Sequence, residues 1–316
     1  MLKQNVPLKE FSNYKIGGNA LYFLDAKTED DLEIGIKEWQ AVRQTVPSDQ
    51  QRVFVLGGGT NILFSDDGFK GLVIRNCLDS ITANGNQVVT GAGTLITKLT
   101  DFCIEHSLSG LEWAGGLPGT VGGAVRGNAG AFGGETKDNV VSVTSLNLTN
   151  LQIKIRNNQE CEFSYRSSIF KTQSTDEVII SAIFGFTNGD KKLIAKAIQE
   201  KAEFRQNKHP LENPNAGSVF KNVPFESITE QYKKELSQYL KNDPIPVVPS
   251  AKIIYLTGLK GKRVGDAAVS EKHTNFIINL GNATARDVSN LIQIIKDEVK
   301  QKYGIILEEE IMRLDQ

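Results

Sequence analysis

Residues 117–133 read LPGTVGGAVRGNAGAFG, a stretch in which glycine recurs and almost no residue is charged. Glycine packs no side chain and loses much conformational freedom on folding. A cluster of glycines therefore indicates a backbone that approaches a ligand closely or adopts positive φ. The alternative, a flexible surface linker, would be rich in serine, whereas alanine, valine and phenylalanine separate many of these glycines. The segment is predicted to be buried against a flat, partly apolar ligand.

Two earlier glycine clusters each follow a predicted strand. GGGTN at 57–61 comes after the apolar run 53–55, and GAGT at 91–94 comes after the run 87–90. Successive backbone N–H groups in such turns form nests that bind anions, and threonine and asparagine side chains add further donors. Neither cluster matches the lysine-bearing phosphate loop or the G-x-G-x-x-G fingerprint. Together the three clusters predict an extended cofactor that carries a pyrophosphate.

Bulk properties exclude several classes of protein. The 316-residue chain has a formal net charge of −1, which argues against a nucleic-acid partner. Its three cysteines have no paired spacing, as is typical of reduced cytoplasmic thiols, and its three histidines lack metal-ligand spacing, so no metal site is predicted. No long apolar run or signal-peptide core occurs. We expect a cytoplasmic protein without a membrane partner, either monomeric or weakly homo-oligomeric.

Strand and helix patterns mix without a regular βα repeat, which favours the α+β class. The predicted strands cover 20–24, 52–56, 71–74, 141–148 and 178–183. One predicted helix begins at a capping box on Thr28. Three others cover 94–107, 191–206 and about 283–303. The chain divides into three predicted parts at 1–76, 77–190 and 191–316. Residues 223–248 resemble an insertion and receive no predicted role.

Several motifs appear in a fixed order along the chain. They are NYKIGG at 13–18, GGGTNIL at 57–63, PGTVGGA at 118–124, NAGAFG at 128–133, YRSS at 165–168, AGSVFKN at 216–222 and LEEEI at 307–311. This set resembles the UDP-N-acetylenolpyruvoylglucosamine reductase family, also called UDP-N-acetylmuramate dehydrogenases, in its shorter subtype without an extra substrate-closing loop. The family usually has tyrosine where this chain has Phe132.

The resemblance implies an FAD enzyme of peptidoglycan precursor synthesis. It implies non-covalent FAD in a two-part domain of the vanillyl-alcohol-oxidase (PCMH) type, formed by residues 1–76 and 77–190. A C-terminal α+β domain at 191–316 would bind the substrate, a UDP-sugar. NADPH would be the reductant, and the enolpyruvyl group of UDP-N-acetylglucosamine enolpyruvate would be reduced to give UDP-N-acetylmuramate.

The resemblance also assigns three catalytic residues: Ser218 as proton donor, Arg166 as the active-site arginine and Glu310 as the active-site glutamate. In this reaction a hydride adds to C3 of the enolpyruvyl group and leaves negative charge at C2 that spreads into the adjacent carboxylate. A guanidinium and a carboxyl group can stabilise that charge, and a hydroxyl can deliver the proton to C2. Three consecutive glutamates leave the register open among Glu308, Glu309 and Glu310. If the segment is a strand, Glu308 and Glu310 share a face and Glu309 points away.

Ligand contacts follow from the same resemblance. The implied cofactor contacts are Gly57, Gly58, Gly59, Thr60, Asn61, Gly91, Gly93, Pro118, Gly119, Thr120, Gly122, Gly123, Asn128, Ala129 and Gly130. The implied substrate contacts are Tyr165, Lys221, Asn222, His273 and Asn275. From the residues alone, a serine such as Ser218 is most often a turn or cap residue, and charges such as Arg166 and Glu310 are usually solvated at the surface. Two other functions stay open: another FAD-dependent oxidase or dehydrogenase of the same fold, and a non-catalytic nucleotide-binding module.

Overall fold

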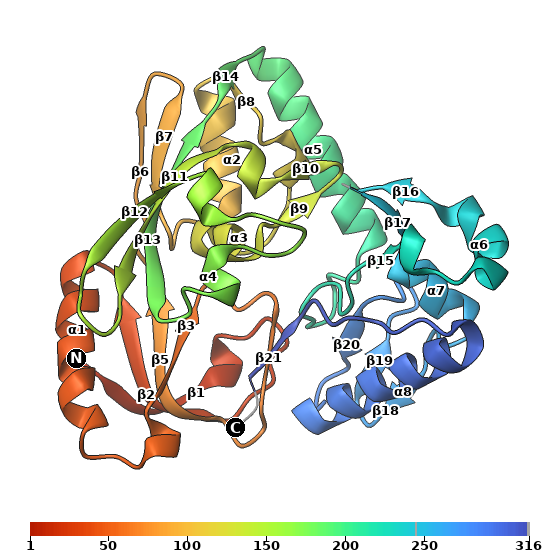
Figure 1. Cartoon of the computed structure of the whole chain (residues 1–316), viewed down its shortest axis with the longest axis horizontal. Coiled ribbons are helices and arrows are strands. Elements are labelled where there is room, and N and C mark those ends of the chain that lie inside the picture. Colours follow the sequence, from red (N-terminus) through yellow and green to blue (C-terminus); the bar gives the residue numbers. More distant parts are fainter. Residues whose placement is uncertain (244, 315–316) are drawn as a thin grey trace. The chain divides into compact units, whose positions relative to one another are not determined.

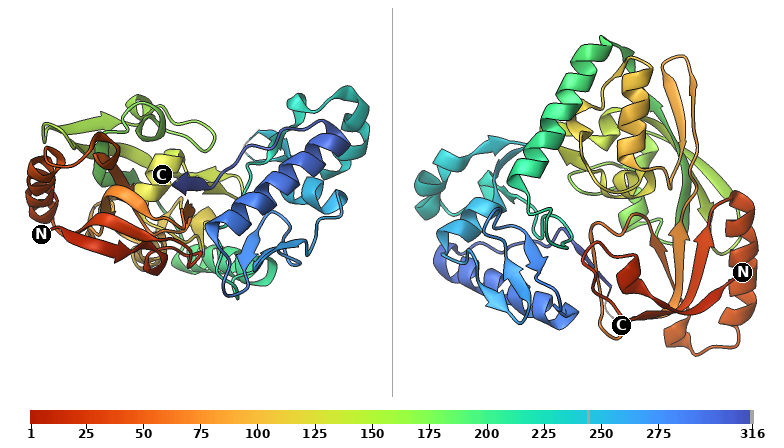
Figure 2. Two further views of the ribbon diagram at one scale, coloured as in Figure 1. Left: turned by 90° about the horizontal axis from the view of Figure 1, so that it is seen from below. Right: turned by 180° about the vertical axis from the view of Figure 1, so that it is seen from behind.

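The computed structural model describes residues 1–243 and 245–314, which form two compact units (Figures 1 and 2). Unit 1 consists of Met1–Val6, Ala20–Gly58 and Lys70–Arg205. Unit 2 consists of Pro7–Asn19, Gly59–Phe69 and the described residues from Gln206 onward. Two short N-terminal segments thus belong to unit 2, whereas each of the three predicted parts is one continuous stretch of the chain. The three-part functional division stays a prediction.

The first sheet of unit 1 has the strand order β1-β2-β5-β3. Its strands are β1 (Lys3–Pro7), β2 (Asn19–Ala26), β3 (Arg52–Leu56) and β5 (Phe69–Asn76), and β3 runs parallel to β5. Helix α1 (Glu29–Arg43) starts with the predicted capping box, in which Thr28 and Asp31 bond each other's backbone N–H. Its buried Leu32, Ile36 and Trp39 pack in one cluster with side chains of β2 and β5. The predicted strands and helix of this part are confirmed.

The second sheet of unit 1 is antiparallel, with the order β12-β11-β13-β7-β6. Its strands are β6 (Ile81–Asn84), β7 (Gln87–Gly91), β11 (Val140–Asn147), β12 (Ile153–Asn157) and β13 (Glu177–Gly185). The helices of this part are α2 (Ile96–Glu105), α3 (Val121–Gly127), α4 (Ile169–Thr172) and α5 (Lys191–Lys208). Two short pairs complete it, β8 (Leu108–Ser109) with β14 (Thr187–Asn188) and β9 (Gly130–Ala131) with β10 (Gly134–Glu135). The central positions of α2 and α3 are buried against this sheet in one hydrophobic cluster.

The core of unit 2 is organised around α8 (Ala285–Tyr303), which confirms the predicted C-terminal helix. Val288, Leu291 and Ile295 lie on its buried face at helical spacing. Its first turn is held by a capping box on Thr284 and by Asp66, whose carboxylate accepts hydrogen bonds from the main-chain N–H groups of residues 285 and 286 at 2.8 and 3.1 Å. Negative charge at a helix N-terminus is stabilising, so these contacts set where α8 begins.

Short strands and two further helices surround α8. The elements are β15 (Val223–Pro224), β16 (Lys241–Asn242), β17 (Pro246–Val248), β18 (Arg263–Val264), β19 (Ala267–Val269), β20 (Ile277–Asn279), α6 (Glu230–Leu236) and α7 (Ser250–Leu256). Strand β21 (Met312–Leu314) pairs in parallel with β4 (Ile62–Phe64). Much of the segment without a predicted role, 223–248, therefore folds as β15, α6, β16 and β17, and its Val223, Ile228, Leu236 and Val248 are part of the core.

The α+β class is confirmed. Among the described residues, no helix combines the length and the apolar content that crossing a lipid bilayer requires.

Candidate functional site

Parts of all three predicted glycine clusters converge in unit 1. Gly57 follows β3, and a Cβ added there would lie only 2.7 Å from Thr120 Oγ1, so the first cluster touches the third. The N–H of Gly122 donates to Ala92 O at 2.8 Å, which joins the third cluster to the second. We call the surface formed by residues 57–58, 91–94 and 118–123 the glycine cradle.

Some cradle glycines are required by the packing of the chain on its own backbone. A Cβ on Gly91 would lie 2.1 Å from Leu78 O, and one on Gly93 would lie 2.5 Å from Leu78 N. Gly119 has φ +110°, a conformation that side chains strongly disfavour. Close packing thus accounts for glycine at 91 and 93, and contact of these two residues with a cofactor stays a prediction.

Helix α3 presents a face without side chains. A Cβ on Gly123 would meet only Thr120 Oγ1, at an ordinary 3.6 Å, and one on Gly127 would meet no atom within 4 Å. Val121, Ala124 and Val125 fill the opposite, buried face. The open face leaves room for a flat ligand. The N–H groups of residues 91–94 all donate to carbonyls of the chain itself, so backbone donors for a pyrophosphate would come from the loops at 57–58 and 119–120. These residues fit a cofactor that carries both a pyrophosphate and a planar ring.

Gly123 offers a direct test of this fit. We expect Gly123→Leu to lower FAD affinity at least tenfold, about 1.4 kcal/mol, because the leucine side chain fills the open face. Gly123→Ala is the matched control and should retain most of the affinity, since its methyl group meets one atom at an ordinary distance. FAD titration by fluorescence, with thermal unfolding of the apoproteins, measures both effects. A leucine variant that binds FAD as wild type does would exclude this face as the cofactor site.

Asn128 connects the end of α3 to the segment that carries Arg166. Asn128 is fully buried and left-handed, with φ 42°. Its Nδ2 donates to Ser164 O at 2.9 Å, and its Oδ1 accepts from Lys137 N at 3.0 Å. Its amide is therefore engaged by the protein, and it fixes the Ser164 turn beside the glycine-rich segment.

Arg166 lies in that turn, in a conformation uncommon for a residue with a side chain. Ser164 and Ser167 exchange two backbone hydrogen bonds of 3.1 Å, and Arg166 has φ +56°. Its guanidinium carbon lies 4.8 Å from the centre of the Tyr165 ring. A Cβ added to Gly130 would lie 3.3 Å from Arg166 Nη1. The structure thus brings Asn128, Gly130, Tyr165 and Arg166 together, at the C-terminal end of α3.

In unit 2, the backbone around Ser218 is held by Asn275. Gly217 has φ +77° with open space where its Cβ would be, and Val219 N donates to Asn275 O at 2.8 Å. The Asn275 side chain accepts from Phe220 N at 3.0 Å and donates to Phe220 O at 2.8 Å. Both ends of this buried amide thus bind the backbone two residues from Ser218. Asn275 positions the serine segment, and its contact with substrate stays a prediction.

The backbone beside Ser218 also contacts the segment that carries the three glutamates at 308–310. Glu310 N donates to Val219 O at 2.8 Å, directly beside Ser218. The Glu308 side chain, 70 % exposed, pairs with Lys221, and the Glu309 side chain pairs with Lys296 and Arg313. Glu309 alone among the three forms a β-bridge, with Phe220, so the segment is not a continuous strand. The assignment of Glu310 as the active-site glutamate stays a prediction.

Several predicted ligand residues also have structural partners in unit 2. A Cβ on Gly59 would lie 1.9 Å from Phe11 O. Asn61 Nδ2 donates to Glu310 O at 3.1 Å, a bond within unit 2. Asn222 Oδ1 accepts from Ser250 N at 3.3 Å. The predicted ligand contacts of Gly59, Thr60, Asn61, Lys221 and Asn222 stay predictions.

His273 lies in an aromatic cluster of unit 2. Its ring centre is 5.4 Å from that of His209 and 4.8 Å from that of Phe276, and its buried Nδ1 has no hydrogen-bond partner among the described residues. Burial in this cluster lowers the pKa of His273 to about 4. His273 is therefore neutral at pH 7 in the folded protein.

This shift predicts a pH-dependent stability. The unfolded chain, with an ordinary histidine pKa near 6.5, takes up a proton that folded His273 does not, so the stabilising contribution is complete above about pH 6.5 and is lost as the pH falls toward 4. Between pH 7.5 and pH 5.0 we expect His273→Gln to lose about 2 kcal/mol less unfolding free energy than wild type. Urea unfolding at the two pH values measures this. Equal losses in the two proteins would show that His273 is not buried in its neutral form.

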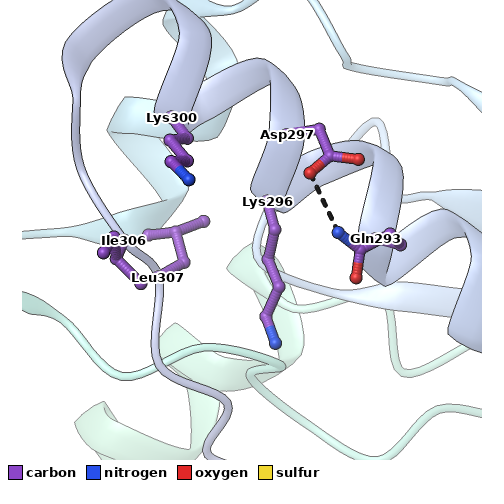
Figure 3. A pocket seen from close by; sticks show the side chains of 6 residues that line it. All are labelled: Gln293, Lys296, Asp297, Lys300, Ile306 and Leu307. Atoms are coloured by element: carbon purple, nitrogen blue, oxygen red, sulfur yellow. Dashed lines mark hydrogen bonds between the residues drawn. The ribbon is translucent and has the colours of Figure 1, made fainter.

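A hollow of about 190 Å³ lies on unit 2 beside α8 (Figure 3). Its lining comes from one side of α8 and from the segment that follows it: Gln293, Lys296, Asp297, Lys300, Ile306 and Leu307. None of the predicted site residues lines it. The sequence interpretation assigned no role to Arg126, although it is the one charged residue within 117–133.

Comparisons with known proteins agree with this geometry. The family model described as "UDP-N-acetylenolpyruvoylglucosamine reductase, C-terminal domain" matches residues 209–314, and the model described as "FAD binding domain" matches residues 35–150. The solved structure of UDP-N-acetylenolpyruvylglucosamine reductase from Thermus caldophilus has a TM-score of 0.76 at 27% identity and covers 100% of both chains.

Curated relatives match nearly the whole chain. The UDP-N-acetylenolpyruvoylglucosamine reductase of Caldanaerobacter subterraneus subsp. tengcongensis is 37% identical over 97% of this chain and 91% of its own length. That of Clostridium novyi is 34% identical over 98% of this chain and 91% of its own length. The chain belongs to the UDP-N-acetylenolpyruvoylglucosamine reductase family.

Proposed function

We propose that this chain reduces the enolpyruvyl group of UDP-N-acetylglucosamine enolpyruvate to give UDP-N-acetylmuramate, with bound FAD and with NADPH as reductant, in peptidoglycan precursor synthesis. The observation that carries the proposal is the convergence of three separate glycine clusters into one cradle in unit 1. Family membership supports the same reaction. The chain is an FAD-containing oxidoreductase.

The cradle and α3 hold the cofactor non-covalently. Backbone N–H groups of the loops at 57–58 and 119–120 would hold the pyrophosphate, and the open face of α3 would accommodate the ring. FAD, when bound there, would supply the transfer of hydride from NADPH to the substrate. No cysteine or histidine occurs in the glycine clusters, so the chain offers no covalent attachment point there.

Three side chains serve the substrate step. Ser218 donates a proton to C2 of the enolpyruvyl group while hydride reaches C3, so that two new C–H bonds replace the double bond. Arg166 neutralises the negative charge that spreads into the substrate carboxylate, and Glu310 shares this task through a hydrogen bond. Asn275 keeps the Ser218 backbone in place through its two bonds to Phe220. Support for these roles comes from the motif matches and from the position of Glu310 beside Ser218.

We also place the enzyme in the cytoplasm, as a monomer or weak homo-oligomer without a nucleic-acid partner. Its three cysteines form no disulfide, which suits a reducing compartment. The net charge of −1 offers no electrostatic attraction for a polyanion.

The test is a stoichiometry under anaerobic conditions. We expect one UDP-N-acetylmuramate formed for each NADPH oxidised, with no turnover by FAD-free protein. Another oxidase of the same fold would instead reduce oxygen to hydrogen peroxide in air and leave the enolpyruvyl substrate unchanged. A nucleotide-binding module would oxidise no NADPH. Either of these two results would overturn the proposal.

A further inference from the structure

Arg126 is a partly buried cation that the proposed mechanism does not use. It lies in the last turn of α3, and its backbone carbonyl accepts a hydrogen bond from Ser168 Oγ at 2.8 Å. Across the part of the chain that the structure describes, its guanidinium has no ion pair, hydrogen bond or ring contact. Burial lowers the pKa of Arg126, with no carboxylate nearby to raise it again.

The two arginines of unit 1 that are fully buried, Arg156 and Arg205, both have partners. Arg156 binds Glu177 through two hydrogen bonds of 2.6 and 2.7 Å. Arg205 donates to Gly115 O and lies 4.9 Å over the ring of Phe132. A guanidinium taken out of water without a partner costs stability, and proteins rarely keep one that serves no purpose. Arg126 therefore has the environment of a residue whose anion comes from outside the chain.

The position of Arg126 indicates which part of a ligand it would meet. It lies three residues after Gly123 and next to Gly127, so it borders the open face of α3. Thr120, in the cradle, lies roughly 9 Å away along the helix axis, at 1.5 Å per residue. Beyond Arg126 the chain reaches Gly130, where Arg166 Nη1 approaches. An extended cofactor with its pyrophosphate in the cradle thus has its ring near Arg126, at the end of the helix where Arg166 lies.

We propose that Arg126 contacts the pyrimidine edge of the flavin ring and stabilises the negative charge that the ring gains on reduction. This inference rests on the proposed function. Hydride transfer from NADPH gives the ring two electrons and one proton, at N5, and releases NADP⁺. The ring therefore gains one negative charge, concentrated at its N1 and C2-oxygen edge. A cation at that edge favours the reduced form, a recognised way in which a protein tunes its flavin.

The test compares holoenzymes of wild type, R126M and R126K. Sulfite adds to N5 of oxidised flavin and places negative charge on the same edge, so it probes Arg126 without turnover. For R126M we expect at least tenfold weaker sulfite binding and a tenfold less favourable reduction, which for a two-electron couple lowers the midpoint potential by about 30 mV. R126K should recover most of both. K154M, which removes an exposed cation from β12, is the matched control and should change neither.

If Arg126 pairs with another anion, the variants are expected to behave differently. If Arg126 paired with the pyrophosphate, R126M would lose affinity for FAD but not for riboflavin, and its potential would stay unchanged. If it paired with the NADPH phosphate, only the KM for NADPH would rise. Either pattern overturns the inference, as does an unchanged sulfite affinity in R126M. If R126M does not fold, sulfite affinity and midpoint potential are measured on R126Q instead, with the same expected results.

The inference and the proposed function can fail separately. Wild-type protein that binds no FAD would overturn both. Wild-type holoenzyme that forms UDP-N-acetylmuramate while R126M keeps wild-type sulfite affinity and potential would overturn only the role of Arg126.

Discussion

Replacing Ser218 with alanine is expected to slow the oxidation of reduced enzyme by substrate about 10²- to 10⁴-fold, the usual effect of losing a general acid. Reduction of the enzyme by NADPH should stay within about twofold of wild type, because that step needs no proton from this hydroxyl. Alanine keeps the local backbone, since Gly217 and the Val219 N–H bond to Asn275 O are untouched. Anaerobic stopped-flow absorbance measures the two half-reactions separately.

The matched control for Ser218 is Ser237→Ala, which removes an exposed hydroxyl bonded only to the local backbone of unit 2. This variant should match wild type in both half-reactions. Equal slowing of both half-reactions in Ser218→Ala would mean that the serine supports cofactor binding or folding rather than proton donation. Retention of the substrate half-reaction would remove Ser218 from the mechanism altogether.

The glutamate series is expected to separate three neighbours of the same chemistry. Glu310→Gln should lower kcat about 10²- to 10³-fold, as loss of one group that stabilises developing charge does. Glu308→Gln and Glu309→Gln should keep kcat within about threefold, because their side chains pair with Lys221 in one case and with Lys296 and Arg313 in the other. Glu309→Gln should also lower the unfolding free energy by up to about 1 kcal/mol, since its partly exposed ion pairs are lost.

Steady-state kinetics and urea unfolding on the three variants decide the register. A large loss of kcat in Glu308→Gln or Glu309→Gln, with Glu310→Gln near wild type, would show that the active-site glutamate is assigned to the wrong position. Similar losses in all three would indicate that the segment acts through its net charge.

Local patterns in the sequence predicted the main helices and strands. The Thr28–Asp31 capping box and the apolar spacing of Leu32, Ile36 and Trp39 specify α1 within a single stretch of chain. Strand β13 is likewise visible as a run of β-branched residues. These signals were sufficient because each element's propensity and its burial pattern agree.

The assembly of unit 2 has no such local signal. Tyr14 is fully buried, its hydroxyl donates to Ile277 O at 2.9 Å, and its carbonyl accepts from Asn279 Nδ2 at 3.0 Å. These partners are more than 260 residues away along the chain. Contacts at such separation depend on the whole fold, so the sequence does not reveal that residues 7–19 and 59–69 belong with the C-terminal part.

The candidate site was predictable to the extent that residue type reveals role. Gly91 lets the backbone pack closely, whereas Gly123 leaves space for a ligand, yet the sequence shows glycine at both positions. Asn275 likewise reads as a polar residue near a pocket, whereas its amide holds Phe220. Only the three-dimensional structure separates these roles, because they differ in what surrounds each residue and not in its chemistry.

The colour of the protein under anaerobic conditions tests the central claim most directly, namely that the glycine cradle binds FAD for a two-step reduction. We expect yellow holoenzyme that NADPH bleaches and that UDP-N-acetylglucosamine enolpyruvate turns yellow again, with one substrate consumed for each flavin. A protein that binds no FAD, or a bleached flavin that only oxygen restores, would contradict the account.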